Sequence, residues 1–240
     1  MSIDFSQLII SGISKGSYPM FWVVLVAAVL VVFVAAIIIY YRSARKHENE
    51  EIASTARNFN MTPLRDDAQL EDLSSTLAEI FSDVAMYVRE LRIVSAYVAN
   101  IRGYTVRITH VVFGMDRGNS KYTIDKVAVL VSEFDKELPE FSLTPRSPRE
   151  KAFRVPSDQS IFSKQTALGT ANAVYAKDAE PVRALLDEQI QEKLSDNEQL
   201  VLVSRGNLLA YYPDGESVVP DDLNAFVEQS LDLTDMLVKV

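Results

Sequence analysis

The sequence of 240 residues contains no cysteine, and this absence excludes several kinds of chemistry together. Without cysteine the chain has no disulfide, no cysteine-type zinc or iron–sulfur site and no thiol nucleophile. Histidine is almost as scarce, because His47 and His110 are the only two. Two separated histidines exclude the HExxH zinc motif and a three-histidine site within one chain. We therefore predict that the protein binds no metal and no cofactor.

Glycine and proline are also scarce, at 8 and 9 residues, which indicates compact structure through most of the length. The chain lacks the GxSxG elbow of serine hydrolases and the phosphate-binding patterns GxxxxGK[ST] and GxGxxG. Acidic pairs at 66–67, 71–72 and 221–222 lie at or near predicted helix starts, where the helix dipole explains them. No catalytic residue is predicted, and an enzyme without recognisable motifs is kept only as a third alternative.

The charge balance is acidic, with 24 lysines and arginines against 33 aspartates and glutamates and a net charge of −9. The basic residues are spread among acidic ones and form no long stripe, so nucleic acid is not expected as a partner. A small-molecule ligand is not expected either. With 48% apolar and 24% charged residues, the composition is that of a folded protein.

One long apolar run is present, FWVVLVAAVLVVFVAAIIIYY over 21–41, without a charge, amide or hydroxyl before its tyrosines. At about 1.5 Å per residue it matches the about 30 Å hydrocarbon core of a bilayer. A signal peptide would have a shorter apolar part with positive charge before it and a cleavage site after it. A transmembrane helix is therefore predicted over 19–41.

Aromatic and basic residues at the two ends of this run resemble the flanks of a membrane span. The predicted membrane-interface residues are Tyr18, Trp22, Tyr40, Tyr41, Arg42, Arg45 and Lys46. Because more positive charge follows the run than precedes it, we predict an external N-terminus and a cytoplasmic segment 42–240. The expected location is the bacterial inner membrane, with the lipid bilayer as one partner.

Other membrane-protein subunits are the second kind of partner predicted. In the N-terminal segment 1–18, an apolar helix face is formed by Phe5, Leu8, Ile9 and Ile13. A frayed N-terminus is an equal alternative for this segment. Within the apolar run, small side chains that permit close helix packing are Ala27, Ala28, Ala35 and Ala36. The alternative for these alanines is ordinary apolar filler.

The first part of the remaining chain is predicted to be a stalk followed by a helix and an antiparallel sheet. Residues 42–60 continue as a charged helical stalk, and apolar residues at helical spacing from Leu70 to Leu91 predict an amphipathic helix. Strand patterns follow over 93–101, 104–113 and 121–134, with a turn at 114–120. PEFSLTP, bracketed by Pro139 and Pro145, suits an edge strand, which completes a segment 61–145. Residues 146–171 are a loop or seam.

The last segment, 172–240, predicts the order strand, helix, strand, strand, helix. ANAVYA is the first strand, and Asp178 caps a helix that runs to Leu194. A tight turn at 205–207 joins the next two strands, and Pro220 begins the final helix. We therefore predict an α+β fold with a mostly antiparallel sheet, one face of which is covered by helices. Segments 61–145 and 172–240 are expected to form one composite domain.

Three stretches resemble an uncharacterised family of bacterial single-span membrane proteins. These are ELPEFSLTP (137–145), VYAKDAEPVRALLDEQI (174–190) and LLAYYPDGESVVPDDLNAFVE (208–228). The resemblance covers about the last two-thirds of the chain. It implies an LPxFxLxP-type extended piece and a C-terminal α+β domain, and it implies no activity.

The function expected from these observations is that of a non-enzymatic, membrane-anchored accessory or scaffold protein. Its cytoplasmic domain would dock onto or stabilise a larger inner-membrane protein assembly. The alternative is a membrane-tethered ligand- or peptide-binding sensor, in which the edge near PEFSLTP or the loop after it accepts a partner strand or a small molecule.

Overall fold

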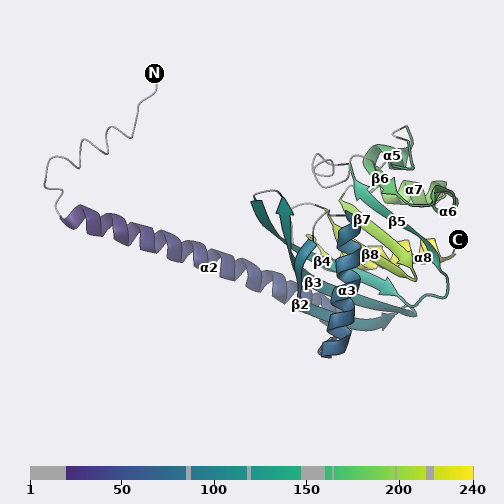
Figure 1. Ribbon diagram of the computed structural model, residues 1–240. Coiled ribbons are helices and arrows are strands. Elements are labelled where there is room, and N and C mark those ends of the chain that lie inside the picture. Colours follow the sequence, from purple (N-terminus) through teal and green to yellow (C-terminus); the bar gives the residue numbers. More distant parts are fainter. Residues whose placement is uncertain are drawn as a thin grey trace, which may run out of the picture. The chain divides into compact units, whose positions relative to one another are not determined.

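The computed structural model describes residues 20–84, 88–117, 120–146, 160–163, 165–197, 199–214 and 219–239 (Figure 1). The chain divides into two compact units, residues 1–49 and residues 50–240. Helix α2 (Met20–Asn58) supplies most of the described part of the first unit, and its last turns belong to the second. In those last turns Ile52, Thr55 and Ala56 are buried in the core of the second unit.

The second unit is built on one sheet of eight strands, and every neighbouring pair in it is antiparallel. The spatial order is β1-β2-β3-β4-β8-β7-β5-β6. The strands are β1 (Thr62–Pro63), β2 (Val88–Ile101), β3 (Tyr104–Arg117), β4 (Ser120–Ser132), β5 (Leu138–Pro145), β6 (Asn172–Tyr175), β7 (Leu200–Gly206) and β8 (Leu208–Pro213). Strands from both predicted segments therefore share a single sheet, and the antiparallel α+β class is confirmed.

Both faces of this sheet are buried, as the central strand β4 shows. Val127, Val129 and Val131 alternate with Ala128 and Leu130, and all five are at most 1% exposed. The odd-numbered residues join a cluster with helix α8 (Leu223–Lys239), called here the α8-side core. The even-numbered residues join a cluster with helix α3 (Asp67–Val84), called the α3-side core. Because side chains alternate along a strand, a run of apolar residues such as VAVLV requires cover on both faces.

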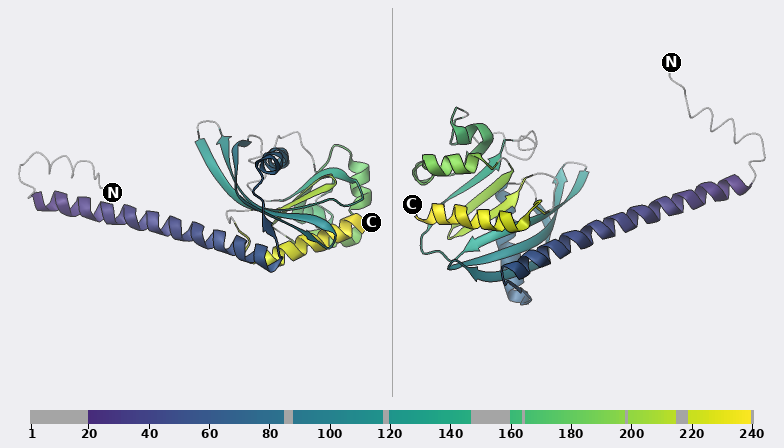
Figure 2. Two further views of the ribbon diagram at one scale, coloured as in Figure 1. Left: turned by 90° about the horizontal axis from the view of Figure 1, so that it is seen from below. Right: turned by 180° about the vertical axis from the view of Figure 1, so that it is seen from behind.

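Helices supply this cover on both sides of the sheet. Helix α3 (Asp67–Val84) places Leu77 and Phe81 in the α3-side core, and the Phe81 ring lies 4.6 Å from that of Phe113. Helix α8 (Leu223–Lys239) covers the other face, and Figure 2 shows α3 and α8 on opposite sides of the sheet. Helices α6 (Ala179–Leu185) and α7 (Glu188–Ser195) also pack on the α8-side core, and α5 (Ala167–Ala171) precedes β6. The prediction that helices cover only one face is wrong.

The predicted transmembrane helix over 19–41 is also wrong by the structure. Within the part of the chain that the structure describes, no helix is long and apolar enough to cross a membrane. Side chains of the apolar run are described from Leu25 to Tyr40. The prediction of a single-pass membrane protein is therefore wrong, and no finding tests the predicted membrane-interface residues.

Two boundaries and one strand position within the second unit also differ from prediction. The helix predicted from Leu70 to Leu91 ends at Val84, and its last predicted turn lies in β2. The predicted turn at 114–120 is too long, because β3 and β4 pair as far as Arg117 and Ser120. The PEFSLTP strand is not an edge: β5 lies between β7 and β6. Pro139 is tolerated there because it falls in a bulge between Leu138 and Phe141.

The C-terminal order is confirmed, with one helix more than predicted. Asp178 caps α6 by accepting from the N–H of Glu180, as predicted. The helix then stops at Leu185, and Asp187 caps a separate α7 by accepting from the N–H of Ile190. The hairpin β7–β8 turns at Gly206, whose φ of +59° favours glycine. Asp222 accepts from the N–H of Ala225 at the start of α8.

Candidate interaction site

The most distinctive surface of the described chain is the apolar segment of α2 from Leu25 to Tyr40. Every side chain in this segment is exposed. The exposed fractions of its large apolar side chains run from 40% at Ile37 to 72% at Tyr40. The large apolar residues concerned are Leu25, Val26, Val29, Leu30, Val31, Val32, Phe33, Val34, Ile37, Ile38, Ile39 and Tyr40. Outside α2, among the described residues, Val94 is the other large apolar side chain in this exposed class.

The segment is apolar around its whole circumference, because it contains no polar side chain before Tyr40. Successive helical residues are turned by about 100°, so Val29, Val34 and Ile39 alone point in three well-separated directions. A helix at the surface of a globular domain normally has one apolar stripe and a polar remainder. A helix that is apolar on all sides is stable only where apolar surroundings enclose it.

The energetic reason is the area left in contact with water. Full burial of a Val, Leu, Ile or Phe side chain is worth about 1.5–3 kcal/mol. The segment is also rich in valine and isoleucine, whose branched side chains have lower helix propensity than alanine or leucine. Intrinsic propensity therefore does not account for this helix, and packing against another apolar surface is needed.

The predicted partner-contact residues fall partly on this segment. Ala28 and Ala35 are seven residues apart and lie on nearly the same side of α2, and Ala27 and Ala36 flank them. All four are exposed. The other predicted contacts, Phe5, Leu8, Ile9 and Ile13, lie outside the described residues, as does Tyr18.

The remaining predicted interface residues lie on α2. Tyr40 and Lys46 are exposed. Trp22, Tyr41, Arg42 and Arg45 belong to the helix, but their side chains are outside the described part of the structure.

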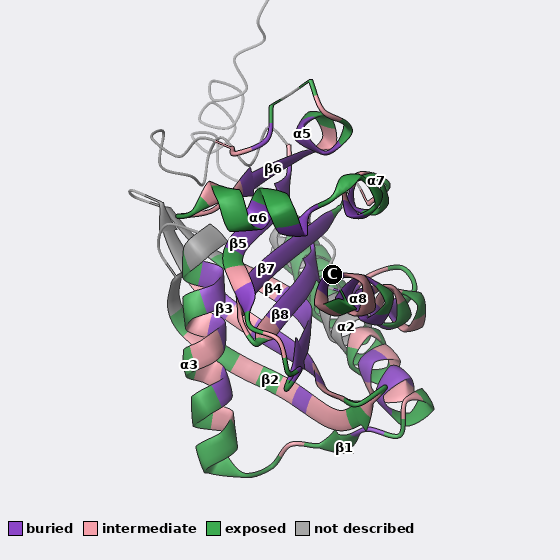
Figure 3. Ribbon diagram, turned by 90° about the vertical axis from the view of Figure 1, so that its right-hand side faces the viewer, coloured by how far each residue is buried: buried purple, intermediate pink, exposed green. Residues whose placement is uncertain are grey.

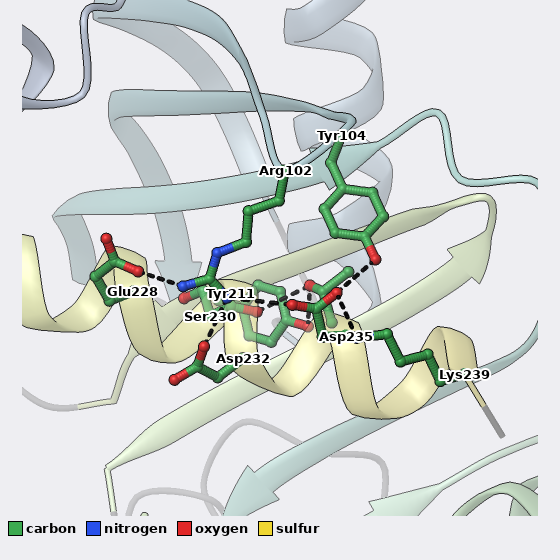
Figure 4. Close-up of polar contacts among 9 residues, drawn as sticks. Arg102, Tyr104, Tyr211, Glu228, Ser230, Asp232, Asp235 and Lys239 are labelled. Atoms are coloured by element: carbon green, nitrogen blue, oxygen red, sulfur yellow. Dashed lines mark hydrogen bonds and ion pairs between the residues drawn. The ribbon is translucent and has the colours of Figure 1, made fainter.

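A second feature of the described surface is a group of polar side chains that joins the β2–β3 hairpin to α8 (Figure 4). The hairpin turns at Arg102 and Gly103, both at positive φ (56° and 88°), as a two-residue type I′ turn requires. Arg102 donates through Nη2 to Glu228 at 2.5 Å and through Nη1 to Asp232 at 2.6 Å. The same Nη1 lies 3.2 Å from Asp235 Oδ2. We call Arg102, Tyr104, Glu228, Asp232, Asp235 and Lys239 the α8 latch.

The electrostatics of the latch follow from its hydrogen bonds. Burial opposes the ionisation of Asp235, but hydrogen bonds from Tyr104, Arg102 and Lys239 outweigh it and lower the pKa of Asp235 below 3.8. The hydrogen bond to Asp232 raises the pKa of Arg102, although burial opposes the rise. Burial, together with the 2.8 Å hydrogen bond to Asp235, raises the pKa of the Tyr104 hydroxyl. The latch is a structural contact in which three carboxylates face two cationic side chains, and each of its charged groups has a partner of opposite charge.

Beneath the latch, a fully buried hydroxyl pair fixes the same helix to the sheet. Tyr211 on β8 and Thr234 on α8 share a hydrogen bond of 2.9 Å, and burial raises the pKa of the tyrosine. Thr234 in turn donates to the carbonyl oxygen of Ser230. This pair was not predicted from the sequence, because its two members are 23 residues apart and meet through the packing of α8 on β8.

His110, one of the two histidines of the sequence, lies on β3. It is buried, and its Nε2 lies 2.5 Å from Asp125 Oδ1 on the neighbouring strand. Ser95 lies opposite His110 across β2 and β3, so that a serine, a histidine and an aspartate share one face. No described hydrogen bond joins Ser95 to His110, and the buried Nδ1 has no hydrogen-bond partner in the described structure. The Asp125 carboxylate is hydrogen-bonded to Nε2, the ring nitrogen farther from the backbone. The three residues therefore do not form a working nucleophile–base relay.

Among the described residues, no group of three or more histidines, aspartates or glutamates is arranged to hold a metal ion. Of the acidic pairs noted in the sequence, 66–67 and 221–222 lie at helix starts, and 71–72 lies in the second turn of α3. Asp66 accepts from the N–H of Gln69 before α3, and Asp222 caps α8. Local helix chemistry accounts for both residues.

Comparison with known proteins adds little to this description. No protein-family model matches the chain, and no curated protein matches it. One solved structure, the crystal structure of the mycobacterial trehalose monomycolate transport factor A, TtfA, is similar at 12% sequence identity. The similarity covers 79% of this chain and 92% of that chain, with a TM-score of 0.49. A likeness of this size assigns neither a family nor a function to this chain.

Proposed function

We propose that this chain is a non-enzymatic accessory or scaffold protein that joins a larger protein assembly through the apolar segment Leu25–Tyr40 of α2. The observation that carries the proposal is the exposure of every side chain of that segment. The α+β unit, by contrast, buries its own apolar residues on both faces of its sheet. The exposed segment is therefore the part of the described chain that most needs a partner.

The shape of the apolar surface indicates the kind of partner. A single partner helix covers one stripe of about 100° and would leave the remaining sides of α2 in water. Several apolar helices, packed around α2 in a bundle, would cover all sides. The small side chains of Ala28 and Ala35 would allow the closest of these helices to approach.

The alternative is a peptide-binding sensor that uses the PEFSLTP strand as an open edge. The structure does not support it, because this strand is not at an edge. β5 is paired on both sides, by β7 and by β6. The outer side of β6 is itself partly covered, because the N–H of Ile161 donates to the carbonyl oxygen of Val174 and Ser160 Oγ accepts from the N–H of Val174. No observation now favours this alternative.

The proposal is tested by one substitution at two matched sites. Ala35→Asp places a charge in the apolar segment of α2, and Ala68→Asp places the same charge at an exposed alanine of α3. Partners that co-purify with the tagged full chain are quantified for each variant and for the parent. Partners bound in stoichiometric amounts should be lost from Ala35→Asp, because an unpaired carboxylate in an apolar interface costs several kcal/mol, and should be retained by Ala68→Asp. Equal recovery from both variants, or no stoichiometric partner of the parent chain, would contradict the proposal.

A further inference from the structure

One edge of the sheet is left largely open. β2 has 14 residues, whereas its outer neighbour β1 has 2. β1 pairs with Tyr97 and Val98, and the N–H of Leu64 donates to the carbonyl oxygen of Ala96 at 2.8 Å. Beyond this point, within the described chain, no strand pairs with the outer side of β2 from Leu91 to Ser95. A row of unpaired backbone groups of this kind is a template for another strand.

The side chains on this edge carry a distinctive pattern. Exposed and partly buried residues alternate from Glu90 to Ser95, as the mixed colours of β2 in Figure 3 show. The exposed ones are Glu90, Arg92 and Val94, and Val94 is 41% exposed. Glu90 and Arg92 take part in no described ion pair. The edge therefore presents one acidic, one basic and one apolar side chain on the same strand.

From this pattern we infer that the open edge of β2 pairs antiparallel with the same edge of a second copy of this chain. In a two-fold arrangement centred on Leu91, each Glu90 lies opposite Arg92 of the other copy, so that two opposite-charge pairs form. Residues directly opposite in an antiparallel pair have Cβ atoms about 4.5–5.5 Å apart, within reach of an ion pair. Two-fold interfaces use the same patch on both subunits, which a self-complementary charge order satisfies.

The order of the charges separates this interpretation from simple edge protection. β2 carries register irregularities between Arg89 and Arg92 and between Ile93 and Ser95, and Glu90 has a φ of 53°. Bulges and charges are also the devices by which proteins keep sheet edges from associating. A protected edge is best served by charges of one sign, which repel a second copy in every register. Here the signs alternate at a spacing of two residues, so that the register centred on Leu91 is attractive.

Charge reversal tests the pairing directly. Glu90→Arg and Arg92→Glu each replace two attractive contacts of the dimer with two repulsive ones. Each should therefore weaken self-association of the full chain by at least about 10-fold. The double variant Glu90→Arg/Arg92→Glu restores opposite charges and should recover the parent value, as measured by sedimentation velocity. If the double variant is no better than the single ones, or if neither single variant changes the association, the inference is overturned.

A second readout does not depend on charge. Because the chain has no cysteine, Leu91→Cys introduces one thiol close to the proposed two-fold axis. Mild oxidation should give a covalent dimer of Leu91→Cys, whereas Asp72→Cys, exposed on α3, should give no covalent dimer. Association through α2 would be insensitive to the charge reversals and would give no Leu91→Cys dimer, and that outcome would also overturn the inference. Circular dichroism of each variant checks that the fold is kept.

Discussion

At the scale of single residues, Arg102 joins two elements that lie far apart in the sequence. It lies in a two-residue turn, 130 residues from Asp232 in sequence, and contacts three carboxylates of α8. Local pattern reasoning finds caps such as Asp178 and Asp222, because the cap and its backbone partner are two or three residues apart. It has no means of pairing Arg102 with α8, since that contact depends on the packing of α8 on the sheet.

Removal of the Arg102 side chain should loosen the attachment of α8. Exposed ion pairs contribute about 0.2–1 kcal/mol each, and Arg102 is 36% exposed, so Arg102→Ala should lower the free energy of unfolding by about 1 kcal/mol. Urea unfolding followed by circular dichroism measures the change. Arg65→Ala is the matched control, because Arg65 is exposed and makes no described contact. An equal effect of both substitutions would show that the latch adds nothing to stability.

The same contact predicts a dependence on pH. The folded pKa of Asp235 lies below its ordinary value of 3.8, so its contribution to stability is fully present above pH 3.8 and is lost as the pH falls through the folded pKa. In Arg102→Ala the pKa should move back towards its ordinary value. The stability difference between the parent and Arg102→Ala should therefore stay constant down to about pH 3.8 and shrink as the pH falls further. A difference that does not shrink below this pH would contradict the assignment.

At the scale of elements, the sequence predicts whether a segment is a helix or a strand better than it predicts where that helix or strand ends. The β-branched runs correctly predicted β3 and β4, and Gly206 correctly predicted the β7–β8 turn. The helix around Leu77 was predicted too long, since Val88 and Leu91 continue its apolar spacing although they belong to β2. The break between α6 and α7 was missed because Leu186, Ile190 and Leu194 continue one apolar pattern across it. The signal was Asp187, a second capping residue within that pattern.

Glycine at position 169, in α5, is required by space. A Cβ there would lie 1.9 Å from the carbonyl oxygen of Ser163 and 2.8 Å from Thr166 Oγ1. Because the nearer atom belongs to the backbone, Gly169→Ala should destabilise the protein by about 2–3 kcal/mol. Gly206→Ala has its nearest contacts at 3.9 Å and meets only the strain of a φ of +59°, which costs about 1 kcal/mol. Thermal unfolding of both variants should rank Gly169→Ala as the less stable, and the reverse order would contradict the packing described for α5.

At the scale of the whole molecule, two properties follow from two different parts of the chain. The unit 50–240 is a sheet buried on both faces, which the apolar run VAVLV of β4 indicates, but strand patterns do not show which helix covers which face. The strand order could not be predicted either, because β4 pairs with β8 and β5 pairs with β7, and these strands are far apart in the sequence. The apolar run was evident from the sequence, but its role as a transmembrane helix is contradicted. Its exposure in α2 remains the feature that requires a partner.

The central claim is that protein surrounds this segment on all sides, and it predicts a specific pattern of contacts. A photoreactive amino acid is placed in turn at Val29, Val34 and Ile39, which point in three directions around α2, and at Ser75, an exposed position on α3. After illumination in cells, adducts are identified by mass spectrometry. The account predicts adducts to other proteins from all three α2 positions and none from Ser75. Adducts from only one direction, adducts to lipid alone, or adducts only to another copy of this chain would contradict it.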